Sequence, residues 1–126
     1  VALGTPDEDV RRVYDLVLAA QEAALAAAHA GIAARALDAA ARDVIAAGGF
    51  GDAFTHSLGH GIGLQTHEWP RVSRQVDYDL PERAVVTVEP GVYLAGRFGV
   101  RIEDMVVLRP GGCENLTRAT KAFLTL

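Results

Sequence analysis

The chain has 126 residues, of which 50% are hydrophobic and 22% are charged, so it is not a disordered protein and fits a single domain over residues 1–126. Its net charge at pH 7 is −4 and its Lys and Arg residues do not cluster, which argues against a nucleic-acid partner. It contains no run of about 18 apolar residues and no secretory signal, so we expect a cytoplasmic protein without a membrane partner.

Two helices are predicted in the first half of the chain. Thr5 is expected to cap the first helix, with Glu8 completing a capping box, and this helix runs to about His29. Apolar residues at helical spacing give it one buried stripe: Val10, Val13, Tyr14, Val17, Leu18 and Leu25. The second helix covers about Ala34 to Ala47 and ends at Gly48.

The second half of the chain is rich in Val, Gly and β-branched residues and is predicted to form a sheet. We expect strands over Phe54 to Leu64, Ala84 to Glu89, Val92 to Leu94, Val100 to Leu108 and Ala122 to Leu126. The fold class is therefore α+β, with two helices packed on one face of a mainly antiparallel sheet. Cys113 follows in a Gly-rich turn and is expected to be an unreactive lone thiol.

Three of the four histidines lie in the glycine-rich segment HSLGHGIGLQTHEWP, residues 56–70. In a strand, His56, Leu58 and His60 share one face, and the glycines let a ligand or a second strand approach the backbone closely. His67 follows an expected glycine bend, so it can return to the same cavity. A single histidine is more often a structural residue, but three in one such segment favour a functional cluster.

Two glutamates are predicted to face each other across a hairpin. A turn at Gly96 pairs residues that are equidistant from it, which places Glu89 opposite Glu103 unless an irregularity at Pro90-Gly91 shifts the register. Opposed like charges destabilise a sheet, and burying them unpaired costs several kcal/mol per ion. A shared proton or a divalent metal would compensate.

The position of Glu103 along its strand sharpens this prediction. Alternation puts Glu103 on the side of Met105 and Val107, a face that looks buried. Arg101 shares that face but carries one positive charge against two negative charges. The alternative is that Glu89 and Glu103 lie at frayed, solvent-exposed strand ends.

A metal is one way to join these groups. His60, Glu89 and Glu103 form a mixed nitrogen and oxygen donor set that suits Mn²⁺, Zn²⁺ or Co²⁺. His56 and His67 lie around it in the predicted cluster. A metal there would lower the pKa of a bound water and polarise a carbonyl, which is the chemistry of amide hydrolysis.

Three motifs, in order, resemble those of the pita-bread-fold metallopeptidases, which include creatinase, methionine aminopeptidase, aminopeptidase P and prolidase: HSLGHGIGLQTHEWP, VVTVEPGVYL and GVRIEDMVVL. The helical segments YDLVLAAQEAALAA and ALDAAARDVI extend the similarity to nearly the whole chain. RIEDM favours the Xaa-Pro branch, aminopeptidase P and prolidase. The resemblance implies the C-terminal half of a pita-bread catalytic domain, with a curved sheet.

The resemblance also implies roles for individual residues. His60, Glu89 and Glu103 match ligands of a two-metal site, usually Mn²⁺ in this branch, and Glu103 matches a bridging carboxylate. His56 and His67 match histidines that hold the substrate and stabilise the attacked carbonyl. Glu89 also matches the residue that takes a proton from the metal-bound hydroxide.

Two more residues are assigned by the resemblance. Arg101 matches an arginine that supports the metal ligands. Trp69 departs from the family pattern, and it either lines the substrate pocket or is a surface aromatic residue. The family's two further aspartate ligands, from a strand pair before the first helix, have no match in the chain.

The implied activity of the parent protein is hydrolysis of Xaa-Pro bonds, in peptides with proline at the second position or in dipeptides, and the chain alone is expected to have little or no activity. An alternative is a non-catalytic peptide- or protein-binding module on the same fold, although binding alone needs no buried carboxylate pair. A further hypothesis is a homodimer that covers the sheet surface left open by the absent half.

Overall fold

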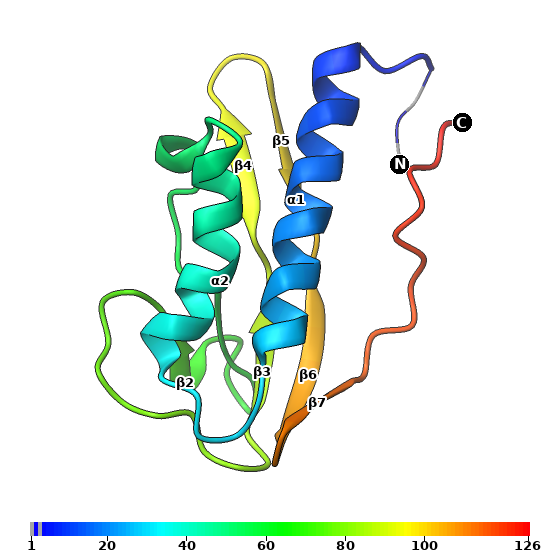
Figure 1. The fold of residues 1–126 in the computed structure, drawn as a ribbon. Coiled ribbons are helices and arrows are strands. Elements are labelled where there is room, and N and C mark those ends of the chain that lie inside the picture. The colour runs from blue at the N-terminus through cyan, green and yellow to red at the C-terminus, as the bar shows by residue number, and fades with distance from the viewer. Residues whose placement is uncertain (1, 3) are drawn as a thin grey trace.

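Two helices cover one face of an antiparallel sheet in the computed structural model, which describes residue 2 and residues 4–126. Helices α1 (Glu8–Ala27) and α2 (Ala34–Ala47) lie side by side (Figure 1). The strands and one short 3₁₀ helix are β1 (Gly59–Gly61), β2 (Glu68–Val72), β3 (Val85–Val88), β4 (Gly91–Leu94), β5 (Phe98–Arg101), β6 (Asp104–Arg109), β7 (Gly112–Asn115) and η1 (Gly51–Ala53). The five-stranded sheet has the order β2-β1-β3-β6-β7, and β4 and β5 form a separate hairpin. The predicted α+β class is confirmed.

The hydrophobic core lies between the helices and the sheet. The helices contribute Val13, Val17, Ala20, Ala24, Leu37, Ala41 and Ile45, all of them completely buried. The sheet contributes Val72, Val86, Val88, Val106 and Leu108. Helix α1 therefore packs through an apolar stripe at helical spacing, as predicted, and α2 packs in the same way. None of the described residues belongs to a helix that is long and apolar enough to cross a membrane.

The start of α1 differs from the prediction. Asp7, not Thr5, caps the helix, because its carboxylate accepts hydrogen bonds from the backbone N–H groups of Asp9 at 2.6 Å and Val10 at 3.4 Å. A carboxylate at this end also interacts favourably with the helix dipole. The helix ends at Ala27, before the predicted end at His29. Helix α2 has the predicted bounds.

One register runs through both hairpin ladders. The β3–β6 ladder pairs Val88 with Asp104, and the β4–β5 ladder pairs Gly91 with Arg101. Both ladders are centred on Gly96, as predicted, so the interruption between β3 and β4 does not shift the pairing. Across the interruption the register places Glu89 opposite Glu103, the pair expected from the sequence.

The predicted strand Val100 to Leu108 is interrupted where these glutamates lie. It divides into β5 and β6, with residues 102 and 103 outside both. The backbone N–H of Ile102 still donates to the carbonyl of Pro90 at 3.4 Å. Proline and its neighbours favour such a break because proline offers no N–H to a ladder.

Strand predictions were also wrong elsewhere. Only Gly59–Gly61 of the range Phe54 to Leu64 is a strand, and Ala122 to Leu126 forms a single parallel bridge between Thr125 and Ala2. Strands β2 and β7 were not predicted. Strand β2 contains Pro70, and it is an edge strand, where a missing N–H group is tolerated.

Candidate active site

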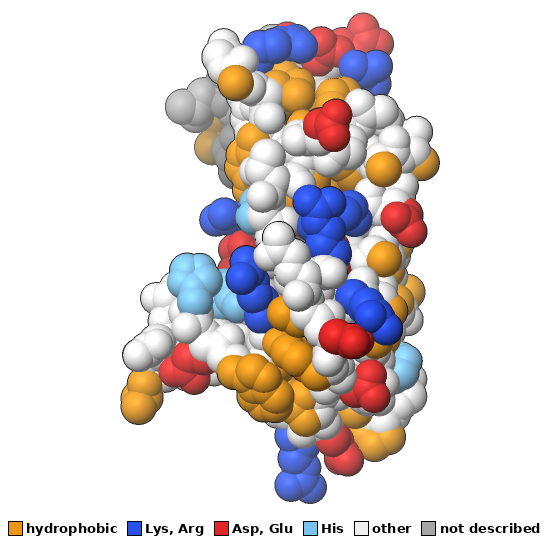
Figure 2. Space-filling model, turned by 90° about the vertical axis from the view of Figure 1, so that its left-hand side faces the viewer, with side chains coloured by type: hydrophobic (Ala, Val, Ile, Leu, Met, Phe, Trp, Pro, Cys, Tyr) orange, Lys and Arg blue, Asp and Glu red, His pale blue; other side chains and the backbone are white. Residues whose placement is uncertain are grey.

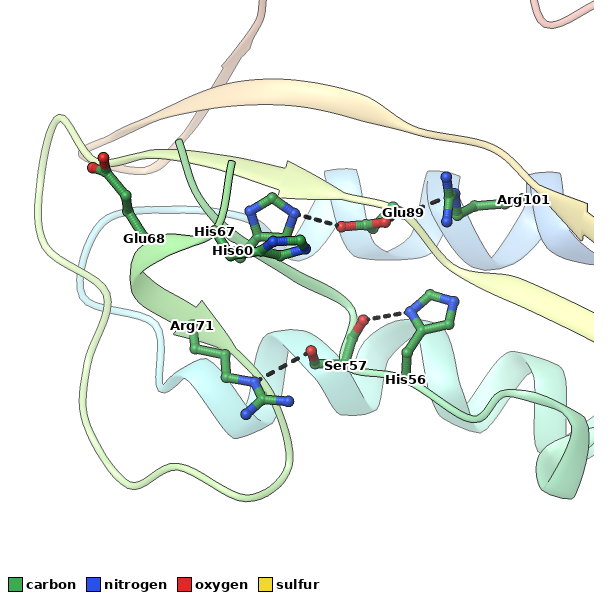
Figure 3. Close-up of a pocket in the computed structure, with 8 residues that line it drawn as sticks. All are labelled: His56, Ser57, His60, His67, Glu68, Arg71, Glu89 and Arg101. Carbon is green, nitrogen blue, oxygen red and sulfur yellow. Dashed lines mark hydrogen bonds and ion pairs between the residues drawn. The ribbon is translucent and has the colours of Figure 1, made fainter. Parts of the chain in front are cut away.

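A cavity of about 640 Å³ gathers the predicted histidines and one of the glutamates. It is lined by His56, Ser57, His60, His67, Glu68, Arg71, Glu89 and Arg101 (Figure 3). A neighbouring cavity of about 540 Å³ shares four of these residues and adds Glu103. Figure 2 shows the hollow from outside, with histidine side chains at its edge and basic side chains beside them.

His60 lies on β1, in the centre of the site. Its Nε2 atom is 3.1 Å from Glu89 Oε1. The glycines on either side allow β1 to lie close to its neighbours, because a Cβ at Gly59 would collide with the backbone carbonyl of Thr87 and a Cβ at Gly61 with that of Trp69. The glycines therefore let β1 lie close to β2 and β3, as predicted. This arrangement places His60 beside Glu89.

His67 returns to the cavity through the loop after β1, as predicted. The ring centroids of His60 and His67 are 4.3 Å apart, and Figure 3 shows the two rings lying against each other beside Glu89. His56 enters from the opposite side, where its Nε2 atom is 3.0 Å from the Tyr93 hydroxyl. Leu58 is completely buried in the core, so the expectation that it shares a face with the histidines is wrong.

The segment that carries His56 is held by a side chain rather than by a neighbouring strand. Arg42 on α2 donates to the backbone carbonyls of Phe54 at 2.9 Å and His56 at 2.8 Å. Its other N–H groups bind Asp38, which is completely buried and also accepts from the N–H of Leu58 at 3.0 Å. This explains why the residues before β1 lack a sheet ladder and still have a defined conformation.

Glu89 is the buried acid of the cavity, with an exposed fraction of 8%. The Thr87 hydroxyl donates to Glu89 Oε1 at 2.9 Å, and the same hydroxyl accepts from the backbone N–H of His60 at 3.0 Å. Thr87 and Glu89 follow each other at strand spacing, so the hydroxyl reaches the carboxylate directly. One carboxylate oxygen therefore faces both a hydroxyl and an imidazole.

Arg101 lies between the two glutamates. Its Nε atom is 3.8 Å from Glu89 Oε2 and 3.7 Å from Glu103 Oε2. Burial opposes the charge of Arg101, but the hydrogen bond with Tyr93 and the charges of both glutamates outweigh burial and raise the pKa of the guanidinium. Arg101 thus supplies part of the positive charge that the opposed glutamates require.

The prediction that Glu103 lies on a buried face is wrong. Its side chain is 43% exposed, and Met105 on the same side is 39% exposed. The buried side of β6 instead carries Asp104, Val106 and Leu108, and the two apolar residues belong to the core that the helices share. The alternation of side chains along β6 was predicted correctly, but the sequence did not reveal which face of the sheet the helices cover.

Comparison with known proteins identifies the family. Residues 1–110 match the sequence profile of metallopeptidase family M24. The chain belongs to metallopeptidase family M24. It is 45% identical over 124 residues to the Xaa-Pro dipeptidase of Pyrococcus furiosus, and this alignment covers 98% of the chain and 36% of that relative. The Xaa-Pro dipeptidase of Lactobacillus delbrueckii subsp. lactis is 41% identical over 126 residues, with 34% of its length covered.

Solved structures agree with this M24 assignment. An X-Pro aminopeptidase from Thermotoga maritima matches with a TM-score of 0.96 and 49% identity, over 100% of this chain and 36% of the other. A Xaa-Pro dipeptidase from Bacillus anthracis matches with a TM-score of 0.98 and 40% identity, over 100% and 36%. The M24 chain therefore spans about a third of the length of the relatives it matches.

The M24 family implies a divalent metal, which side chains with nitrogen and oxygen donor atoms would have to hold. Within residues 2 and 4–126, no group of three or more His, Cys, Asp or Glu side chains is placed to hold a metal ion. His60 and Glu89 do form a close nitrogen and oxygen pair, and Glu103 is joined to Glu89 through Arg101. Imidazole and carboxylate donors suit a divalent ion. The guanidinium of Arg101 lies near both glutamates, so positive charge is already favoured at this position.

Some residues in or beside the cavity were not predicted from the sequence, and one predicted residue lies outside it. Trp69 is 67% exposed and packs near Tyr78 outside the cavity, which favours the surface alternative. Ser57, Arg71 and Tyr93 were not predicted. Arg71 and the exposed Trp69 both alternate with the buried Pro70 on β2, so strand alternation alone gave no signal that Arg71 lines the cavity.

Proposed function

We propose that the protein containing this chain hydrolyses Xaa-Pro dipeptides with the help of divalent metal ions. The observation that carries the proposal is the cavity that gathers three histidines around the buried carboxylate Glu89. Metallopeptidase family membership supports the reaction class, and the names of the relatives, Xaa-Pro dipeptidase among them, support the substrate.

We assign the metal to His60, Glu89 and Glu103, with Glu103 as a bridging carboxylate, Mn²⁺ as the ion and two ions in the complete site. When bound, divalent ions of this kind acidify a water molecule and polarise a carbonyl. Two further carboxylate ligands would come from outside the chain. For this reason we propose that the chain alone binds metal weakly and has little or no peptidase activity.

The chain's own side chains would divide the remaining work. Glu89 accepts the proton of the attacking water, because its carboxylate oxygens are hydrogen-bond acceptors, are buried and are held in place by the Thr87 hydroxyl. His56 and His67 donate hydrogen bonds to the substrate carbonyl as negative charge develops on its oxygen. The positive charge of Arg101 reduces the repulsion between the carboxylates of Glu89 and Glu103.

Arg71 favours dipeptides over longer peptides as substrates. It lines the cavity from β2, its Nε atom donates to the Ser57 hydroxyl at 3.3 Å, and it makes no ion pair among the described residues. A guanidinium without a carboxylate partner at a peptide-sized cavity matches the free α-carboxylate of the proline in an Xaa-Pro dipeptide.

The first test is isothermal titration of Mn²⁺ into the metal-free chain and into Glu89→Gln. Glu82→Gln is the matched control, because the Glu82 side chain is 54% exposed and outside the cavity. We expect weak, saturable binding by the chain and by the control, and none by Glu89→Gln. Equal binding by all three proteins would contradict the metal assignment.

The second test is turnover of a Xaa-Pro dipeptide with Mn²⁺ by the purified chain and by a longer protein that carries the two missing ligands. We expect turnover only by the longer protein, and loss of it with Glu89→Gln. Turnover by the chain alone would contradict its proposed inactivity. No Mn²⁺ binding and no turnover by either protein would favour the non-catalytic binding module.

A further inference from the structure

A second, smaller cavity adjoins the proposed catalytic cavity. Its volume is about 70 Å³, and it shares Ser57 and Arg71 with the larger cavity. Its wall includes three arginines and three hydroxyl side chains, namely Arg42, Arg71, Arg74, Thr55, Ser57 and Ser73. No carboxylate side chain lines it. We refer to it as the arginine pocket.

Two of the three arginines carry a positive charge that no ion pair within the described part of the chain neutralises. Arg42 is paired with the buried Asp38 at 2.7 Å and serves as a fixed wall. Among the described residues, Arg71 and Arg74 form no ion pair. Most other arginines of this acidic chain do pair with carboxylates, so the concentration of free guanidinium groups at one small cavity is unusual for the molecule.

The hydroxyl groups add donors beside these charges. Ser73 has an exposed fraction of 3%, and its oxygen accepts from the backbone N–H of Gln75 at 3.2 Å. The oxygen of Ser57 accepts from Arg71 at 3.3 Å. Each hydroxyl accepts here through its oxygen, which leaves its hydrogen available to donate.

We propose that the arginine pocket binds a small tetrahedral oxyanion, represented by inorganic phosphate. Guanidinium groups bind phosphate oxygens through paired, charge-assisted hydrogen bonds, and serine hydroxyls complete such sites. A pocket volume of about 70 Å³ leaves room for a small anion beside the arginines. The arginine pocket shares Arg71 and Ser57 with the proposed catalytic cavity. Anion binding needs neither a metal nor peptidase activity, so its failure and the failure of the proposed function are distinguishable.

The test is isothermal titration of sodium phosphate into the metal-free chain, with sodium chloride of equal ionic strength as the salt control. The pocket variant is Arg74→Gln, and the matched control is Arg118→Gln, which removes the same charge from another exposed arginine outside the pocket. We expect saturable phosphate binding by the chain and by Arg118→Gln. Arg74→Gln should weaken it by about tenfold, the value of one charge-assisted hydrogen bond in affinity.

Nuclear magnetic resonance locates the bound anion. Phosphate should shift the backbone amide signals of residues 55–57 and 73–75 in the chain, and chloride should not. Circular dichroism spectra of the two variants should match that of the chain, because both substituted side chains are exposed. Equal phosphate affinity in Arg74→Gln and Arg118→Gln, or an equal response to chloride, would overturn the proposal.

Discussion

Thr87 joins two site residues through one hydroxyl group. The hydroxyl accepts from the backbone of His60 and donates to the carboxylate of Glu89. It is completely buried, so water cannot replace either bond without entering the sheet. The hydroxyl therefore fixes the orientation of a proposed metal ligand, and residues of this kind affect metal affinity without touching the ion.

Substitution of Thr87 by Val should lower the Mn²⁺ affinity of the chain by about tenfold or more, since removal of an outer hydrogen-bond partner has that effect in metal sites. Val keeps the shape of Thr but offers no hydroxyl. Thr87→Ser restores the hydroxyl and should recover most of the affinity. Isothermal titration measures both, and unchanged affinity in Thr87→Val would show that Glu89 does not need this bond.

Cys113 should be slow to react in the folded chain. Burial and the negative charge of Asp104 raise the pKa of its thiol, and its sulfur lies 3.6 Å from the carbonyl of Leu25. At pH 8 we expect slow alkylation by iodoacetamide, with fast alkylation in urea as the control. The pKa of this thiol is higher in the folded chain than in the unfolded chain. The thiol therefore contributes its full stabilisation at pH values below the unfolded pKa, and this contribution is lost as the pH rises through the folded pKa. Equal alkylation rates in both solutions would refute the expectation.

At the scale of elements, α2 supports the site through Asp38 and Arg42. Asp38 is completely buried and the Arg42 side chain is 13% exposed, so the pair is shielded from water. Through it, α2 holds the irregular segment that carries His56. The pair is thus a structural substitute for a neighbouring strand.

Removal of Arg42 should destabilise the chain strongly. Arg42→Ala leaves the Asp38 carboxylate buried and uncompensated, which costs about 3–5 kcal/mol of unfolding free energy. Arg42→Lys should recover only part, because an ammonium group cannot replace the planar fork of arginine. Urea unfolding measures these values.

The matched control for that experiment is Arg35→Ala, which removes the exposed pair of Arg35 with Asp77. An exposed pair contributes about 0–1 kcal/mol, so this variant should unfold nearly as the chain does. Equal destabilisation by Arg35→Ala and Arg42→Ala would mean that burial does not set the strength of the Asp38–Arg42 pair.

Helices were predicted better than strands because their signals are local. The bounds of α2 follow from apolar spacing and the stop at Gly48, whereas the strand before His60 was overextended because its residues look like a strand but bind Arg42. The hairpin register was predictable because a turn at Gly96 determines it. Strand β2 was missed because edge position, which permits Pro70, is a property of the whole sheet.

The site was predictable where its residues lie within the quoted motifs. His60, His67 and Glu89 meet in one cavity as expected. Arg71 and Tyr93 reach the site only through tertiary packing, and nothing in their local spacing indicates a cavity. The choice of the covered sheet face, which misplaced Glu103, likewise depends on the helices and not on strand alternation.

At the scale of the whole molecule, the sheet has a helix-covered face and a more open one. Met105 and Glu103 lie on the open face, and the chain spans only about a third of the length of its relatives. The homodimer expected from the sequence stays a prediction. Analytical ultracentrifugation should detect it, and Met105→Glu should shift it to monomer, because a charge on the open face opposes its pairing. A clean monomer without the substitution would refute the homodimer.

The shared register of the two hairpin ladders has a consequence for the length of the chain. Two residues, Glu89 and Pro90, span the interruption on one side, and two residues, Ile102 and Glu103, span it on the other. An insertion or deletion on one side alone would make the two ladders incompatible. Glu89 and Glu103 thus occupy the part of the hairpin least able to change length, whereas the turn at Gly96 can grow without moving them. Loop grafts and inserted tags belong at that turn.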